Sequence, residues 1–292
     1  MRLISFLLLW IAVLQVANAD IPDIARPAYV QMCTLRGLEI MKKPESVVQI
    51  GGTCGMTSLV SLMGEHAPVK LMTLNEKIYS NEIVLRTLDG FVTNMENADQ
   101  FSRDWEKCDF ILARGQMELL RETSQGELLY KSAMKFSEEF AGWTTTFMNG
   151  ARGDLALKED HIEALMLYHG AKPTIAQSKD GDKVQDGFIP KWYEQINKCV
   201  SDRSVCPEPV VMAAVNGYSR MTWGDVLMTP YKKKSGDPRF SHWIILKDEI
   251  VLKDGIYTIT TWSWSKRSQV RIHQAVIDTY FIVGVYGSFD KK

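Results

Sequence analysis

The chain has little that would suit it to nucleic acid, to a membrane surface or to a metal ion. Its 34 basic and 35 acidic residues give a formal net charge of −1, so charge provides no case for either kind of surface binding. No Cys-x2-Cys or His-x3-His spacing occurs, which argues against a zinc site. Internal repeats and low-complexity tracts are also missing. We therefore expect no metal, no cofactor and no nucleic-acid partner.

Long apolar runs are also scarce, and the only one lies at the amino terminus. It extends from Leu3 to about Val16 and is followed by a small-x-small cleavage site at residues 17–19. The run of about 14 residues is shorter than the roughly 20 that span a bilayer, and no cysteine follows it to carry a lipid. A cleaved signal peptide over residues 1–19 is therefore favoured over a membrane anchor. We expect a secreted or periplasmic protein with no membrane association after cleavage.

Cysteine is sparse, but the number is odd. Of five cysteines, four can form disulfides in an oxidising compartment and the fifth is left free. Cys199 and Cys206 border one short loop and are suggested as a pair, which leaves Cys33 with Cys108. Four cysteines allow three connectivities, and the sequence does not choose among them. Cys54 is the candidate free thiol.

The residues around Cys54 indicate the start of a helix. Two glycines and a threonine precede it, and apolar residues recur after it at helical spacing, namely Met56, Leu59, Val60 and Met63. Unpaired N–H groups and the positive end of the helix dipole stabilise negative charge on sulfur. Because the thiolate is the nucleophilic form, the position predicts a reactive cysteine.

The apolar pattern changes from helical to extended along the chain. Helical spacing is typical of segments near residues 74–88, 98–123, 125–141 and 158–169. After Pro207 the pattern predicts strands near residues 210–215, 242–246, 256–260, 269–272 and 280–286. The turn residues 253–255 predict a hairpin between the second and third of these strands. We expect an α+β protein with a helical part over residues 20–206 and a β part over residues 207–292.

A cysteine nucleophile needs a base, and five histidines are candidates. His66 is expected on a loop, and His161 and His169 flank a predicted helix, where they would face solvent or the helix ends. His273 ends a strand near charged residues. His242 begins a strand directly after a loop, so its imidazole should lie at a sheet edge. We favour His242, although an ordinary hydrogen-bonded histidine at a strand start has the same pattern.

Four segments, in their order along the chain, resemble the papain-like cysteine peptidase superfamily. Its members carry a glutamine shortly before a cysteine that opens the central helix, then a proline-led strand, a histidine at the start of a hairpin, and an Asn-Ser-Trp element on the return strand. The matching residues are Gln49 with Cys54-Gly55, the strand 208–215, Ser241-His242-Trp243, and Ser263-Trp264. The nucleophile region is similar to bacterial papain-like or bacteriocin-processing-like peptidases, in which Cys-Gly after a glutamine is common.

The resemblance implies a two-lobed fold with a helical amino-terminal lobe and an antiparallel β carboxyl-terminal lobe. It implies that Cys54 is the nucleophile and His242 the general base. Gln49 would donate to the oxyanion together with the backbone N–H of Cys54. Trp264 would pack over the site.

One position departs from the family pattern, because Trp262 stands where the family has the asparagine that orients the imidazole. An indole can donate a hydrogen bond but cannot accept one from an imidazole N–H. Thr261 or Ser263 could substitute, a distant carboxylate could do so, or Cys54 and His242 could act as a dyad.

Two classes of function follow from these residues. The first is an exported cysteine peptidase that cleaves peptide or protein substrates, or a related thiol acyltransferase. The second is an inactive papain-like relative that serves as a secreted protein-binding module. The tryptophans clustered in the predicted hairpin would suit such recognition, although burial in a core is their commoner fate.

Overall fold

The structure is a computed structural model that describes residues 30–141, 155–177, 188–222, 224–232 and 242–290. The predicted signal peptide, residues 1–19, lies outside the described residues. The helices are α2 (Val30–Lys42), η1 (Pro44–Ser46), α3 (Cys54–His66), α4 (Pro68–Ser80), α5 (Glu82–Glu96), α6 (Asp104–Arg121), α7 (Gly126–Ala141), α8 (Glu159–Tyr168), α9 (Phe188–Ser201), α10 (Tyr218–Met221) and η3 (Ile277–Thr279). The strands are β1 (Ala171–Gln177), β2 (Pro209–Val215), β3 (Val226–Leu227), β4 (His242–Leu246), β5 (Val251–Lys253), β6 (Ile256–Ser263), β7 (Lys266–His273) and β8 (Phe281–Phe289).

The ends of the helices follow from local capping chemistry. α4 begins at Pro68, which lacks the N–H that would be unpaired at a helix start. Asn81 ends α4 and caps α5 by accepting a 3.1 Å hydrogen bond from the amide of Val84. The helical pattern predicted near residues 74–88 is therefore two helices separated at Asn81. α6 begins with the side chain of Glu106, which accepts from the amides of Ser102 and Arg103.

The strands form one mixed sheet in the order β1-β8-β2-β4-β6-β7-β3, with β5 paired to β6. All pairs are antiparallel except β3 with β7. The sheet is thus mostly antiparallel, as predicted, but it also includes β1, which precedes residue 207. The turn at residues 253–255 joins β5 to β6 rather than β4 to β6. β4 pairs instead with the far end of β6.

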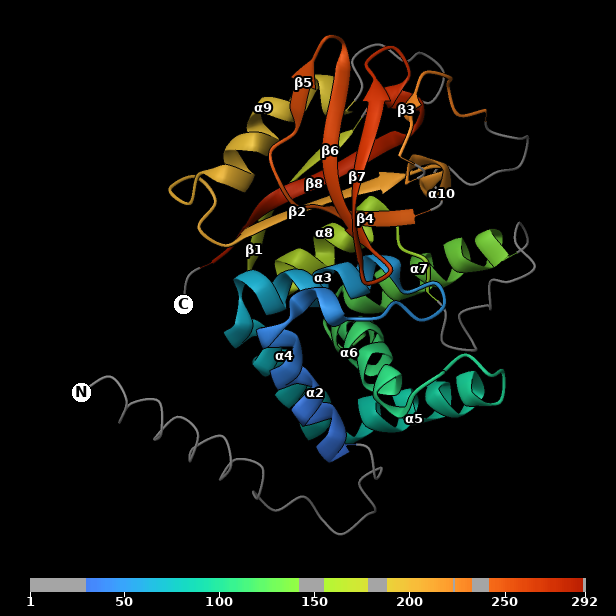
Figure 1. The fold of residues 1–292 in the computed structure, drawn as a ribbon. Coiled ribbons are helices and arrows are strands. Elements are labelled where there is room, and N and C mark those ends of the chain that lie inside the picture. The colour runs from blue at the N-terminus through green and yellow to red at the C-terminus, as the bar shows by residue number, and fades with distance from the viewer. Residues whose placement is uncertain (1–29, 142–154, 178–187, 223, 233–241, 291–292) are drawn as a thin grey trace.

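The sheet separates two apolar cores, because neighbouring side chains of a strand point to opposite faces. In β2, Met212 and Ala214 face the core formed with helices α2 to α8, whereas Val211 and Ala213 face the core formed with α9. Figure 1 shows most of the helices below the sheet, with α3 directly beneath it and α9 on the other side. The first core therefore joins the helical part to the sheet.

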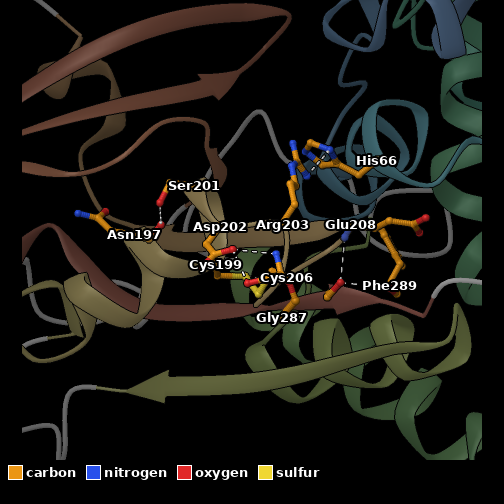
Figure 2. The surroundings of a disulfide bond; sticks show 12 residues. His66, Asn197, Cys199, Ser201, Asp202, Arg203, Cys206, Glu208, Gly287 and Phe289 are labelled. Carbon is orange, nitrogen blue, oxygen red and sulfur yellow. Dashed lines mark hydrogen bonds between the residues drawn. A yellow bond between two sulfur atoms is a disulfide. The ribbon is translucent and has the colours of Figure 1, made fainter.

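Two disulfides are present, Cys33–Cys108 and Cys199–Cys206, and Cys54 is free. The suggested pairing is therefore found. Figure 2 shows the second bond between the end of α9 and the start of β2, beside β8. Disulfides persist in oxidising compartments, so both are consistent with export.

Within the described part of the chain, none of the helices has the length and apolar character needed to cross a bilayer.

Candidate active site around Cys54

Cys54 is the first residue of α3, as the sequence predicted. Gly51 before it has a φ of 55°, a left-handed conformation that glycine adopts without strain. Thr53 does not cap the helix, because its hydroxyl donates to the carbonyl of Ile50 at 2.7 Å. The first N–H groups of α3 therefore receive no side-chain cap from Thr53 and lie next to the sulfur.

Gly55 allows the start of α3 to approach β4 closely. A Cβ atom at this position would lie 2.7 Å from Cδ1 of Ile162 and 3.3 Å from Cδ1 of Trp243. The indole of Trp243 is itself buried and donates to the carbonyl of Leu157 at 2.8 Å. The lack of a side chain after the cysteine is thus a packing requirement of the sheet above it.

The sulfur of Cys54 meets β4 where β4 and β6 separate. These two strands pair only through Ile245 with Trp262 and Leu246 with Thr261. Nearer the start of β4, the amide of Trp243 donates to the Cys54 sulfur over 3.5 Å. Because Trp243 directly follows His242, the thiol lies beside the backbone of the predicted base. The fold thus brings together two segments that are 189 residues apart in the chain.

The imidazole of His242 is buried among one hydroxyl and two aromatic rings. Its Nε2 forms a short hydrogen bond with the hydroxyl of Ser263. The ring of Trp264 stacks on it with centroids 4.4 Å apart and an interplanar angle of 29°, and the ring of Tyr218 lies 5.2 Å away. Among the described residues, the one hydrogen bond given for the His242 ring is that between Nε2 and Ser263.

The three residues considered for the third position have separate contacts. Ser263 is the one that bonds the imidazole. Trp262 points its indole N–H to the carbonyl of Glu45 at 3.3 Å, on the opposite side of β6. The hydroxyl of Thr261 lies 3.4 Å from that of Tyr218. Alternation along β6 explains the difference, since Trp262 and Ser263 point to opposite faces of the sheet.

The turn after Ser263 is strained. Trp264 and Ser265 connect β6 to β7 as a two-residue turn, with φ values of 49° and 57°. Turns of this kind favour Asn-Gly, because a side chain in the left-handed region costs about 1 kcal/mol or more per residue. The turn nevertheless carries a tryptophan that is 51% exposed and stacked on His242. Such strain is typical of positions with a functional constraint.

Gln49 lies between η1 and α3 and is partly exposed. Its side-chain amide donates to the carbonyl of Gly51 at 3.1 Å. One of the two amide hydrogens is therefore used inside the loop that precedes Cys54.

Burial dominates the electrostatics of the Cys54 site. It raises the pKa of the Cys54 thiol from 9.0 to about 11, although hydrogen bonds from the backbone of Trp243, Gly55 and Cys54 itself act to lower it. Burial also lowers the pKa of His242 from 6.5 to about 3. The pKa of the thiol thus moves opposite to the prediction from the helix terminus, because loss of water outweighs the backbone donors. At neutral pH the resting pair is a thiol and a neutral imidazole.

Three of the other four histidines occupy different environments from those predicted. His66 is the last residue of α3 rather than part of a loop, and its ring lies 3.5 Å from the guanidinium of Arg203 (Figure 2). His161 and His169 do lie at the two ends of α8, but both are buried. His273 ends β7, as expected.

Sequence reasoning missed a buried polar pair beneath α3. The Nε2 of His169 lies 3.0 Å from Oε1 of Gln116, and the Gln116 amide donates to the carbonyl of Met56 at 3.0 Å. Burial lowers the pKa of His169 to about 3, and the nearby charges of Lys77 and Lys70 act in the same direction. A glutamine within residues 110–120, most of which are apolar, was the signal that could have been noticed.

Comparison of the chain with protein-family models, with curated proteins and with solved structures finds no match. In the described residues, no group of three His, Cys, Asp or Glu side chains is arranged to hold a metal ion. The contacts around Cys54 are therefore the basis on which a function can be assigned.

Proposed function

We propose that this protein is a papain-like cysteine peptidase of the secreted or periplasmic space, with the helical part and the sheet as its two lobes. The single observation that supports the proposal is the amide of Trp243 donating to the Cys54 sulfur, because Trp243 is the residue that follows His242 in the chain. Cys54 is the nucleophile and His242 the base, and both were predicted from sequence. Ser263 takes the role of the family's asparagine, since its hydroxyl bonds Nε2 and leaves Nδ1 for the thiol.

The reaction begins from a neutral pair, since burial disfavours charge on both groups. As the sulfur attacks a peptide carbonyl, its proton passes to Nδ1 of His242 and the carbonyl electrons move to oxygen. The oxyanion is stabilised by the N–H of Cys54 and by the amide of Gln49. When the intermediate collapses, the imidazolium gives its proton to the departing amine, and water then hydrolyses the thioester.

Substitution of Cys54 tests the proposal. Cys54→Ser should reduce hydrolysis of casein or a peptide library by about 10³-fold or more and abolish labelling by a thiol-directed epoxide. Because the other four cysteines are in disulfides, one label per chain is expected for the unaltered protein. Ser58→Ala, on the same helix and also buried, is the matched control and should keep both activities. Hydrolysis and labelling that survive Cys54→Ser would disprove the assignment.

A second function is favoured by the direction of the two pKa shifts. A thiol with a raised pKa beside an imidazole with a lowered one is the resting state of an inert buried cysteine as well. The protein would then be an inactive relative whose exposed Trp264 contacts a peptide or protein partner. The rate of alkylation by iodoacetamide at pH 7, compared between the unaltered protein and His242→Gln, separates the two. Only in a catalytic pair does the imidazole take the thiol proton as the sulfur reacts, so only there should loss of the ring slow the labelling.

A thiol acyltransferase would use the same residues and the same thioester. It differs only in the acceptor, which would be an amine instead of water. Adding a primary amine to the hydrolysis assay and measuring amide product by mass spectrometry distinguishes the two activities.

A further inference from the structure

Residues 45–48, here called the strap, run from within η1 into the loop that carries Gln49. Two of their carbonyls are bound from the sheet: the Trp262 indole donates to Glu45 at 3.3 Å, and the Ser265 hydroxyl donates to Val47 at 2.5 Å. The other two residues are bound from the helices, since the carbonyl of Ser46 accepts from Arg36 at 2.7 Å and the amide of Val48 donates to Asp109 at 2.8 Å. Successive residues of the strap are therefore bound alternately by the two parts of the protein.

The helical anchor of the strap is a buried ion pair. Arg36 and Asp109 are both buried and form two hydrogen bonds, of 2.8 and 2.9 Å. The guanidinium also lies 4.4 Å from the ring centroid of Trp105. The Cys33–Cys108 disulfide joins the same two helices next to this pair. Removing either partner of a buried ion pair leaves an uncompensated charge and is strongly destabilising, so the pair is a strong constraint on this end of the strap.

On the sheet side, the strap is bound by Trp262 and Ser265, which lie on either side of the two residues that contact His242. Trp262 precedes Ser263, which bonds the imidazole, and Ser265 follows Trp264, which stacks on it. The two strap contacts thus hold both ends of the segment 263–264. They also account for the side-chain direction of Trp262, whose N–H is used to bind the strap instead of the imidazole.

We infer that the strap sets the position of Ser263 and Trp264 relative to the loop before Cys54, with Trp262 and Ser265 as positioning residues for the His242 imidazole. This inference rests on the proposed function for its catalytic meaning. The geometry it describes, however, can be measured without any substrate.

The test uses Ser265→Ala and Trp262→Phe in the full chain, with Ser201→Ala as the matched control. Ser201 and Ser265 are both exposed, and each donates to a backbone carbonyl, in the case of Ser201 that of Asn197 at 2.8 Å (Figure 2). The control therefore loses the same kind of hydrogen bond at a site far along the sequence from the strap. Ser265→Ala keeps the exposed turn and is expected to fold even if the buried Trp262→Phe does not.

The readout is the pH midpoint of C2 hydrogen exchange of the His242 imidazole, followed by mass spectrometry. A loosened imidazole regains water, so the midpoint should rise by about one pH unit or more in the strap variants and stay unchanged in Ser201→Ala. In peptide hydrolysis, kcat should fall about 10-fold in the strap variants with KM nearly unchanged, because misplacement affects chemistry more than binding.

The two proposals fail in different ways. If Ser265→Ala has the exchange midpoint of Ser201→Ala, the strap does not position the imidazole, whatever the activity. If the midpoint shifts but the unaltered protein shows no hydrolysis that depends on Cys54, the strap inference stands and the peptidase proposal fails.

Discussion

His169 and His242 are two buried histidines with the same acid–base behaviour and different surroundings. Burial lowers the pKa of each to about 3. His169 lies beneath α3 and is bound to Gln116, which in turn binds the carbonyl of Met56. His242 lies in the sheet next to the segment that contacts Cys54, and an exposed indole covers it. One ring is part of the support of the helix, whereas the other belongs to the residue before Trp243, whose amide contacts the sulfur of Cys54.

The difference teaches that a displaced pKa does not by itself mark a reactive histidine. Both shifts arise because water is removed from the ring, and any well-packed histidine can experience this. The features that set His242 apart are geometric: the neighbouring thiol, the serine on Nε2 and the strained turn that holds Trp264. Function should therefore follow these contacts and not the pKa.

The strongest test of this comparison is to replace each histidine by glutamine. His242→Gln should reduce hydrolysis by about 10³-fold, because no general base remains. His169→Gln can still donate to Gln116 and should keep hydrolysis while destabilising the protein by about 1–2 kcal/mol. Steady-state rates and urea unfolding measure the two effects. Equal losses of hydrolysis in both variants would contradict the assignment of His242 as the base.

Ser263, whose hydroxyl bonds the imidazole of His242, offers a second test with a smaller expected effect. Ser263→Ala should lower kcat about 10- to 100-fold, because the imidazole loses the hydrogen bond that sets its orientation. Ser263→Asn provides the side chain that orients the imidazole in papain-like peptidases and should restore part of that loss. Ser268→Ala, on β7, is a hydroxyl deletion without contact to the His242 ring. Peptide hydrolysis over a range of pH checks the three variants, and an unaffected Ser263→Ala would exclude serine as the orienting residue.

Substitution of two glycines tests the difference between the surroundings of His242 and His169 without altering either histidine. Gly55→Ala would place a methyl group 2.7 Å from Ile162, and Gly115→Ala, beside Gln116, would place one 2.5 Å from Ile78. Overpacking of this kind costs about 1–3 kcal/mol. Thermal unfolding should show both losses. Hydrolysis should fall only for Gly55→Ala, because only that change displaces Trp243 from the Cys54 sulfur.

The pH dependence of stability should not distinguish the two histidines. Each has a folded-state pKa of about 3, below its ordinary value of 6.5, so the unfolded chain binds more protons between these pH values. Their contribution to stability is complete above pH 6.5 and is lost as pH falls toward 3, at about 1.4 kcal/mol per pH unit for each ring. Urea unfolding between pH 4 and 7 should show this slope.

Removing either ring should reduce the slope by the same amount. His169→Gln and His242→Gln are then alike in acid sensitivity, although they differ in hydrolysis. A reduced slope in only one of them would show that the two burial environments are not equivalent.

Much of the secondary structure could be predicted from local sequence patterns. The change from helical to alternating apolar spacing located most of the helices and strands, and the glycines before Cys54 located the start of α3. The odd cysteine number identified Cys54 as the free thiol. These features depend on residues close in sequence or on simple pairing, so they could be read before any contact was known.

The partner of His242 could not be read in the same way. The family pattern pointed to position 262, but the alternation of β6 directs Trp262 to the strap and Ser263 to the imidazole. A shift of β6 by one residue would exchange the faces of Trp262 and Ser263, so the register of β6 decides which side chain reaches the ring. That register is set by the paired strands and by the strap rather than by the local sequence.

The sequence by itself determined which residues could do chemistry: one unpaired thiol at a helix start and a histidine opening a strand. Only the tertiary structure decided their charge state, their hydrogen-bond partners and the strap that joins the two parts of the protein. The physical reason is that desolvation and hydrogen bonding depend on atoms contributed by distant segments. Spacing along a chain records the period of a helix or strand, but it does not record which distant surface covers it.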